Sequence, residues 1–202
     1  MGWFRSFFCA RALQPPRRRI TESEAVKMVT EHLATAAIEA WPKLRSSFQD
    51  FAPVQLPAID EEQASLDLLL AATALDMQAI PNLFPADQAE RLIELTFLFG
   101  RSLRHDDYGV HELMAYIDLY QDELARSQNN PLEAIEAVCW RLLRRWYGNK
   151  PDVLQVDLDE YGLGNQKNAF FADYVVEALM NPSFVGTWKT LNGTFIIAQR
   201  LR

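Results

Sequence analysis

The side chains with the clearest potential for chemistry gather between positions 105 and 122. His105 and Asp106 are adjacent, and the helix expected after them carries further metal-ligand types on one side, at His111, Asp118 and Asp122. Imidazole and carboxylate groups bind divalent cations, so these residues could form a metal cluster. The usual helical signatures, a His-x-x-x-His pair or a Glu-x-x-His motif, are missing, and a solvated helix face explains the same spacing. We therefore predict no bound metal.

The segment Leu103-Arg-His105-Asp106-Asp-Tyr-Gly109 resembles the Leu-x-His-Asp-x-Gly pattern of the HD superfamily of helical phosphohydrolases. The resemblance implies that His105 and Asp106 hold a metal ion whose bound hydroxide attacks a phosphoester. It also implies a separate histidine, for which the upstream residue is His32, and a distant aspartate, for which the choices are Asp157, Asp159 and Asp173. A polar turn before a helix explains the segment equally well, because acidic residues stabilise a helix N-terminus. A phosphohydrolase of HD type is therefore one alternative function.

Other catalytic and binding signatures are missing from the sequence. There is no Gly-x-Ser-x-Gly nucleophile elbow, no P-loop and no complete glycine pattern for a dinucleotide. Asp157-x-Asp159-x-Tyr161-Gly162 begins like a calcium loop, but Tyr161 and Asn168 replace two of its ligands. Cys139, in an apolar stretch of an expected helix, is predicted to be a core residue rather than a reactive thiol. These observations lean against an enzyme, and we expect no cofactor.

One carboxylate stands out by its position on an expected helix. Residues 60–80 form the most apolar helix of the sequence, which we expect at the centre of the fold, with a narrow polar stripe of Asp60, Gln63, Asp67 and Gln78. Asp76 falls on the opposite, apolar side, so it is the one carboxylate that we expect to be partly buried. Buried carboxylates either accept hydrogen bonds or shift their pKa. Asp76 is therefore a third candidate catalytic residue, in addition to His105 and Asp106. The competing explanation for its burial is a structural hydrogen bond to a loop or an arginine.

The elements that must position these residues are mostly helical. Thr21 and Glu24 form the Thr-x-x-Glu capping pattern that begins a helix, and Pro42 ends or kinks it. Asn192-Gly193 lies between two β-rich runs, 187–191 and 194–198, which predicts a hairpin. We predict a mainly α protein in which residues 20–202 form a single domain, a helical bundle of about six to seven helices with a small C-terminal β-hairpin. The expected elements are helices at 21–41, 43–51, 60–80, 85–104, 108–127, 131–148 and 165–180, and a strand at 153–158.

Residues 1–19 form a basic aromatic N-terminal segment that carries five arginines and no acidic residue. Its large aromatic side chains recur at helical spacing, at Trp3, Phe4, Phe7 and Phe8. A short basic helix of this kind can lie in a membrane interface, with an arginine cluster near anionic lipid at Arg17, Arg18 and Arg19. Gly2 and Ser6 match an N-myristoylation pattern, and Cys9 is placed for palmitoylation. The alternatives are a helix that docks its aromatic residues on the domain and a loose tail.

The charge of the chain points to a basic partner. A net charge of −7 argues against a nucleic-acid-binding protein, because phosphate contacts need a basic face. Between positions 50 and 123 the chain has fifteen acidic residues and three arginines, which predicts an acidic helical surface. We therefore expect a non-enzymatic protein-interaction module, such as an adaptor, a chaperone or an immunity-type protein, that binds a basic protein partner. Its expected partner-binding residues are Glu90, Glu94, Asp118 and Asp122.

The sequence leaves two further questions undecided, whether a basic patch forms a second contact surface and whether the protein associates with a membrane. Arg141, Arg144 and Arg145 lie in the last turns of an expected helix, where cations interact favourably with the helix dipole. They could also receive the acidic face of a partner or of another copy. No apolar stretch reaches the length of a transmembrane helix, so we expect a cytoplasmic protein, with membrane association through residues 1–19 as the alternative.

Overall fold

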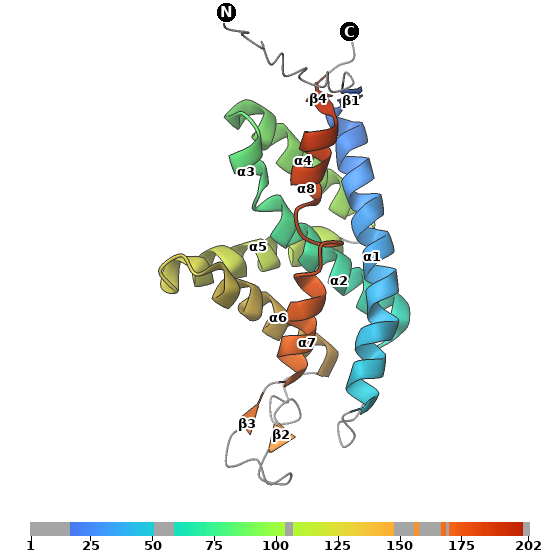
Figure 1. Cartoon of the computed structure of the whole chain (residues 1–202), viewed down its shortest axis with the longest axis vertical. Coiled ribbons are helices and arrows are strands. Elements are labelled where there is room, and N and C mark those ends of the chain that lie inside the picture. The colour runs from blue at the N-terminus through green and yellow to red at the C-terminus, as the bar shows by residue number, and fades with distance from the viewer. Residues whose placement is uncertain are drawn as a thin grey trace, which may run out of the picture.

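The computed structural model describes residues 17–50, 59–103, 107–147, 156–157, 167–168 and 170–199 (Figure 1). Within these ranges the protein is mainly α-helical, with seven helices of eight or more residues and a single four-residue turn of helix. This confirms the mainly α class and the expected number of helices. The helical elements are α1 (Glu22–Asp50), α2 (Glu61–Met77), α3 (Ile80–Leu83), α4 (Ala86–Ser102), α5 (Tyr108–Arg126), α6 (Pro131–Tyr147), α7 (Phe170–Leu179) and α8 (Thr187–Thr194).

Helix α1 begins at the predicted capping box and is longer than predicted. The Glu24 amide donates to Thr21 Oγ1, and the Thr21 amide donates in return to Glu24 Oε2. The helix then continues through Pro42 to Asp50, so the two helical pieces predicted on either side of Pro42 are joined. Trp41 is 2% exposed and Leu44 is 4% exposed. Burial of these two side chains favours a continuous helix in spite of the missing proline N–H.

Helix α2 is the central element of the fold, as its composition predicts. It packs against α1, α5 and α6, and most of its residues are buried. Asp60 caps its N-terminus by accepting a hydrogen bond from the Gln63 amide at 2.8 Å. The helix ends at Met77, earlier than predicted, and α3 follows with Pro81 in its first turn. Figure 1 shows α1 along one side of the molecule and the α5–α6 pair extending away from it on the other side.

The predicted C-terminal hairpin is wrong. Residues 187–194 form helix α8, and Asn192-Gly193 lies inside it. The strand that follows, β4 (Ile196–Ala198), pairs in parallel with β1 (Arg19–Thr21), so that Ile197 faces Ile20. Trp188 and Leu191, three positions apart, are both buried on one side of α8. This helical burial outweighs the local preference of Asn-Gly for a turn.

A second small sheet lies in the region where a strand is predicted at 153–158. β2 (Val156–Asp157) pairs with β3 (Lys167–Asn168) in antiparallel fashion. The helix predicted at 165–180 begins later, at Phe170. No helix in the described ranges combines the length and the hydropathy that a membrane crossing requires.

Helices α4 and α5 approach each other backbone to backbone at Gly100 and Gly109. A Cβ atom at Gly109 would collide with the Gly100 carbonyl oxygen, whereas one at Gly100 would have Leu113 Cδ2 as its nearest neighbour at 3.6 Å. We expect Gly109→Ala to lower the free energy of unfolding by about 2 to 3 kcal/mol. The matched variant Gly100→Ala should leave it unchanged or raise it by up to about 1 kcal/mol. Urea unfolding measures both, and equal stabilities would contradict the close approach.

Candidate functional site

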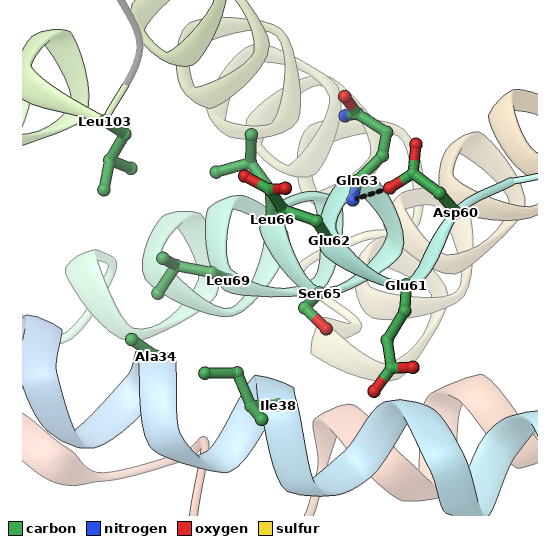
Figure 2. A pocket seen from close by; sticks show the side chains of 10 residues that line it. All are labelled: Ala34, Ile38, Asp60, Glu61, Glu62, Gln63, Ser65, Leu66, Leu69 and Leu103. Carbon is green, nitrogen blue, oxygen red and sulfur yellow. Dashed lines mark hydrogen bonds between the residues drawn. The ribbon is translucent and has the colours of Figure 1, made fainter.

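A groove of about 740 Å³ lies between α1 and α2, and we call it the α1–α2 groove (Figure 2). Its floor is apolar. Two floor residues come from α1, two from α2 and one from the end of α4: Ala34, Ile38, Leu66, Leu69 and Leu103. In Figure 2 the side chains of Ala34 and Ile38 lie on the side of α1 that faces α2.

Helical spacing brings the floor residues together. Ala34 and Ile38 are four positions apart on α1, and Leu66 and Leu69 are three apart on α2, so each pair shares one side of its helix. Leu69 is buried and anchors the base of the groove, whereas Ile38 is 59% exposed. Ile38 is thus an exposed apolar side chain at the edge of an apolar floor whose other residues are buried or partly buried, where a partner could contact it.

The rim of the groove is acidic. Asp60, Glu61 and Glu62 line it, all three are exposed, and no lysine or arginine is among the lining residues that the structure describes. These carboxylates lie at the first turn of α2, where the helix dipole stabilises negative charge. Among the described residues, no ion pair engages Glu61 or Glu62. The Glu61 side chain extends from α2 toward α1 in Figure 2, so negative charge stands beside the apolar floor.

Asp67 belongs to the predicted polar stripe of α2, yet it is only 1% exposed. Its Oδ1 accepts hydrogen bonds from the Tyr108 hydroxyl at 2.6 Å and from Gln63 Nε2 at 2.9 Å. Its Oδ2 accepts one from Trp146 Nε1 at 3.2 Å and lies 3.5 Å from Arg145 Nε. The expectation that Asp76 is the one buried carboxylate is therefore wrong, because three helices surround Asp67 and supply donors to it.

A second carboxylate extends this network toward the surface. Glu112 of α5 lies 3.0 Å from Arg145 Nη1 and 3.1 Å from Arg141 Nη2. Burial, together with the hydrogen bond to Asp67, raises the pKa of Tyr108, so its hydroxyl stays a neutral donor. The network links α2, α5 and α6 through hydrogen bonds and ion pairs, so its role is to stabilise the packing of these helices.

The arginines predicted as a possible docking patch surround a pocket of about 580 Å³ between α5 and α6. Arg141 and Arg145 pair with Glu112, and Arg126, which also lines the pocket, lies 3.3 Å from Glu123. Nearby carboxylates thus offset most of the positive charge. The pocket therefore offers less positive charge to an acidic partner than the number of its arginines suggests.

Asp76 is buried, as predicted, with 3% of its surface exposed. Its carboxylate accepts hydrogen bonds from the backbone amides of Gly186 at 3.0 Å, Thr187 at 3.1 Å and Trp188 at 3.3 Å. Burial raises the pKa of Asp76 to about 6, although the three amide hydrogen bonds act in the opposite direction. The carboxylate of Asp76 caps the start of α8. This agrees with the structural explanation given above, a hydrogen bond to a loop, rather than with a catalytic role.

The metal-site residues predicted from the sequence are only partly described. His105, Asp106 and Asp159 lie outside the described residues, and the described backbone of Asp157 and Asp173 does not place their side chains. His32 lines a pocket between α1 and α8, whereas Ala34, two positions later on α1, faces the α2 side. In the ranges that the structure describes, no three histidine, cysteine or acidic side chains are grouped to hold a metal ion. The HD-type phosphohydrolase stays a prediction.

The other predicted surface residues lie on separate elements. Glu90 and Glu94 are exposed on α4, and Asp118 and Asp122 are exposed on α5, outside the lining of the α1–α2 groove. The membrane-contact residues Trp3, Phe4, Phe7 and Phe8 and the lipidation candidates Gly2 and Cys9 lie outside the described residues. Among the arginines that follow, Arg17 donates to the Asn192 carbonyl at 2.9 Å, and Arg18 and Arg19 are exposed.

No protein-family model matches the chain, and neither the curated proteins nor the solved structures contain a match to it. What defines the protein at this stage is its mainly α fold and an apolar groove with an acidic rim.

Proposed function

We propose that the protein is a non-enzymatic protein-interaction module that binds a basic amphipathic helical segment of a partner in the α1–α2 groove. The observation that supports this most is the composition of the groove. An open apolar floor with Ile38 59% exposed lies beside three exposed carboxylates, and the described part of the lining contains no basic residue. An adaptor, a chaperone or an immunity-type protein would each use a surface of this kind.

The proposed binding mode is an amphipathic helix laid in a groove. Such a helix inserts apolar side chains at helical spacing and keeps its charged side chains at the rim. Here the floor would take the apolar side chains, while Asp60, Glu61 and Glu62 would attract lysine or arginine. The exposed acidic residues of α4 and α5 add to the negative field, which speeds the approach of a basic partner at low salt.

The apolar part of the proposal is tested by a pair of equally exposed residues. Ile38 in the groove and Leu98 on α4 are each 59% exposed, so neither supports the core. The probe is a fluorescent leucine–lysine amphipathic peptide of about 14 residues, a generic helix-in-groove ligand. We expect Ile38→Asp to weaken binding at least about tenfold, which corresponds to about 1.4 kcal/mol. Leu98→Asp should bind as the wild type does, and equal effects of both changes, measured by fluorescence anisotropy, would contradict the proposal.

The charged part of the proposal is tested by reversing charge at matched places. Glu61→Lys/Glu62→Lys alters the rim, and Glu90→Lys/Glu94→Lys makes the same charge change outside the groove. At physiological salt, charges farther than about 8 Å apart are largely screened, so the rim variant should lose about tenfold in affinity and the α4 variant less than about twofold. If both lose affinity equally, then general electrostatic attraction rather than the groove binds the probe.

A further inference from the structure

We infer that residues 1–16 of the same chain occupy the α1–α2 groove when no partner is bound, so that the N-terminal segment is an intramolecular competitor of the partner. The inference rests on the proposed function, because it names the same groove. It assigns a regulatory role to a segment that carries only positive side-chain charge, whereas the whole chain has a net charge of −7.

The segment has the two properties that the groove selects. It contains four large aromatic side chains, which suit the apolar floor: Trp3, Phe4, Phe7 and Phe8. Its charged side chains are Arg5 and Arg11, with no acidic residue among positions 1–16, so they complement the carboxylates of the rim. Aromatic and arginine side chains are the residue types that dominate binding free energy at protein interfaces.

The segment is long enough to reach the groove. It leaves the described structure at Arg17, beside the start of α1, and Ile38 lies sixteen residues beyond Glu22 along that helix. At 1.5 Å per residue this is a distance of about 24 Å. The aromatic residues lie nine to fourteen positions before Arg17, a stretch that spans about 30 to 46 Å when extended, so they reach the floor if the residues that join them to Arg17 are extended.

A nearer pocket fits the segment less well. It lies between α1 and α8, has a volume of about 510 Å³ and is lined partly by Met28, Leu191 and Phe195. Its lining contains one acidic residue, Glu31, whose carboxylate already lies 3.7 Å from Lys27 Nζ. The α1–α2 groove offers three carboxylates, and none of the described residues in its lining is basic, so charge favours the groove.

Docking within one chain has a simple consequence for affinity. A tethered segment acts at an effective concentration of about millimolar, so even weak docking competes with a partner in solution. A partner must displace the segment, and the displaced aromatic residues then become free for another surface, such as a membrane.

The location of the segment is tested with a nitroxide attached to Cys9 in the full chain. The other cysteine, Cys139, is buried, so the label goes to the segment. We expect broadening of the amide signals of Ala34, Ile38 and Leu66, and recovery of these signals in the Glu61→Lys/Glu62→Lys background. Broadening at Met28 and Phe195 instead, or at no defined place, would overturn the inference. So would broadening that arises only between labelled and unlabelled copies, because it would assign the groove to a second copy.

The competition is tested in the full chain by Arg5→Glu/Arg11→Glu. This variant should bind the leucine–lysine probe at least about fivefold more tightly than the wild type, because its segment no longer complements the rim. Equal affinity of the two proteins, without local broadening, would reject the competitor and leave the groove as a partner site. No binding by either protein would reject the proposed function itself. Binding of anionic vesicles by the segment with no broadening of groove signals would assign the aromatic residues to a membrane, against the inference.

Discussion

Replacing Asp67 by alanine is expected to lower the free energy of unfolding by about 3 to 5 kcal/mol, the largest stability effect predicted for this protein. Asp67 is 1% exposed and accepts hydrogen bonds from Tyr108, Gln63 and Trp146. Its removal leaves the Arg145 guanidinium without the carboxylate beside Nε, in a partly buried position. Arg145 keeps its ion pair with Glu112 but loses one of its two carboxylate neighbours, and the tyrosine, glutamine and tryptophan donors lose their acceptor.

The test of this prediction is urea unfolding of Asp67→Ala beside Asp118→Ala. Asp118 is an exposed acid on α5, so its loss should change the stability by no more than about 0.5 kcal/mol. The double variant Asp67→Ala/Arg145→Met should be more stable than the sum of its single changes predicts, because each single change alone leaves the other charge without one of its partners. A single variant Asp67→Ala within about 1 kcal/mol of the wild type would contradict the structural role of the network.

Asp76→Ala is expected to lower the free energy of unfolding by about 2 to 3 kcal/mol at about pH 5, because three backbone amides at the start of α8 lose their acceptor. Those amides belong to Gly186, Thr187 and Trp188. Since α8 leads directly into β4, the loss should also expose the β1–β4 pair to hydrogen exchange. Exchange confined to other elements would contradict this placement of Asp76.

The same variant should show a defined pH dependence. Burial raises the pKa of Asp76 from its ordinary 3.8 to about 6 in the folded protein. The folded state therefore holds the proton more tightly than the unfolded state, and the stability from this group is fully present below about pH 4 and lost as the pH rises through about 6. The stability difference between wild type and Asp76→Ala should narrow by about 1 kcal/mol between about pH 5 and pH 7. A difference that stays constant over this range and widens only between about pH 2 and pH 4 would show that the pKa is lowered instead.

Most helices could be predicted from the sequence because their signals are local. The capping box at Thr21 and the apolar composition of α2 each lie within one element, and the structure confirms both the start of α1 and the buried, central position of α2. The C-terminal hairpin was predicted from an equally local signal, Asn192-Gly193, and it is wrong. Two distant partners decide that region: Asp76, which caps α8 across more than a hundred positions, and β1, which pairs with β4.

Burial of Asp67 could not be predicted for a related reason. On the helix it falls in line with Asp60 and Gln63, which indicates a solvent-facing stripe. What buries it is the packing of α5 and α6 against that side, which brings Tyr108 and Arg145 to the carboxylate. The spacing of Arg141 and Arg145 is a weak signal of such a pairing, because two cations four positions apart on one helix face need compensation.

The α1–α2 groove also depends on tertiary packing. From charge alone, the sequence suggests Glu90, Glu94, Asp118 and Asp122 as partner-binding residues, and these stay a prediction. The structure shows a different set of carboxylates, Asp60, Glu61 and Glu62, beside an apolar floor. Because the floor combines residues from α1, α2 and the end of α4, no single stretch of sequence contains its pattern.

The most direct test of the groove as a binding site is an NMR titration of the isotope-labelled full chain with the leucine–lysine probe. We predict that chemical-shift changes concentrate on Ala34 and Ile38 of α1 and on the first turns of α2, and that Ile38→Asp abolishes them while Leu98→Asp does not. Shifts centred on the arginine-lined pocket between α5 and α6, or no saturable shifts at all, would contradict the proposed groove.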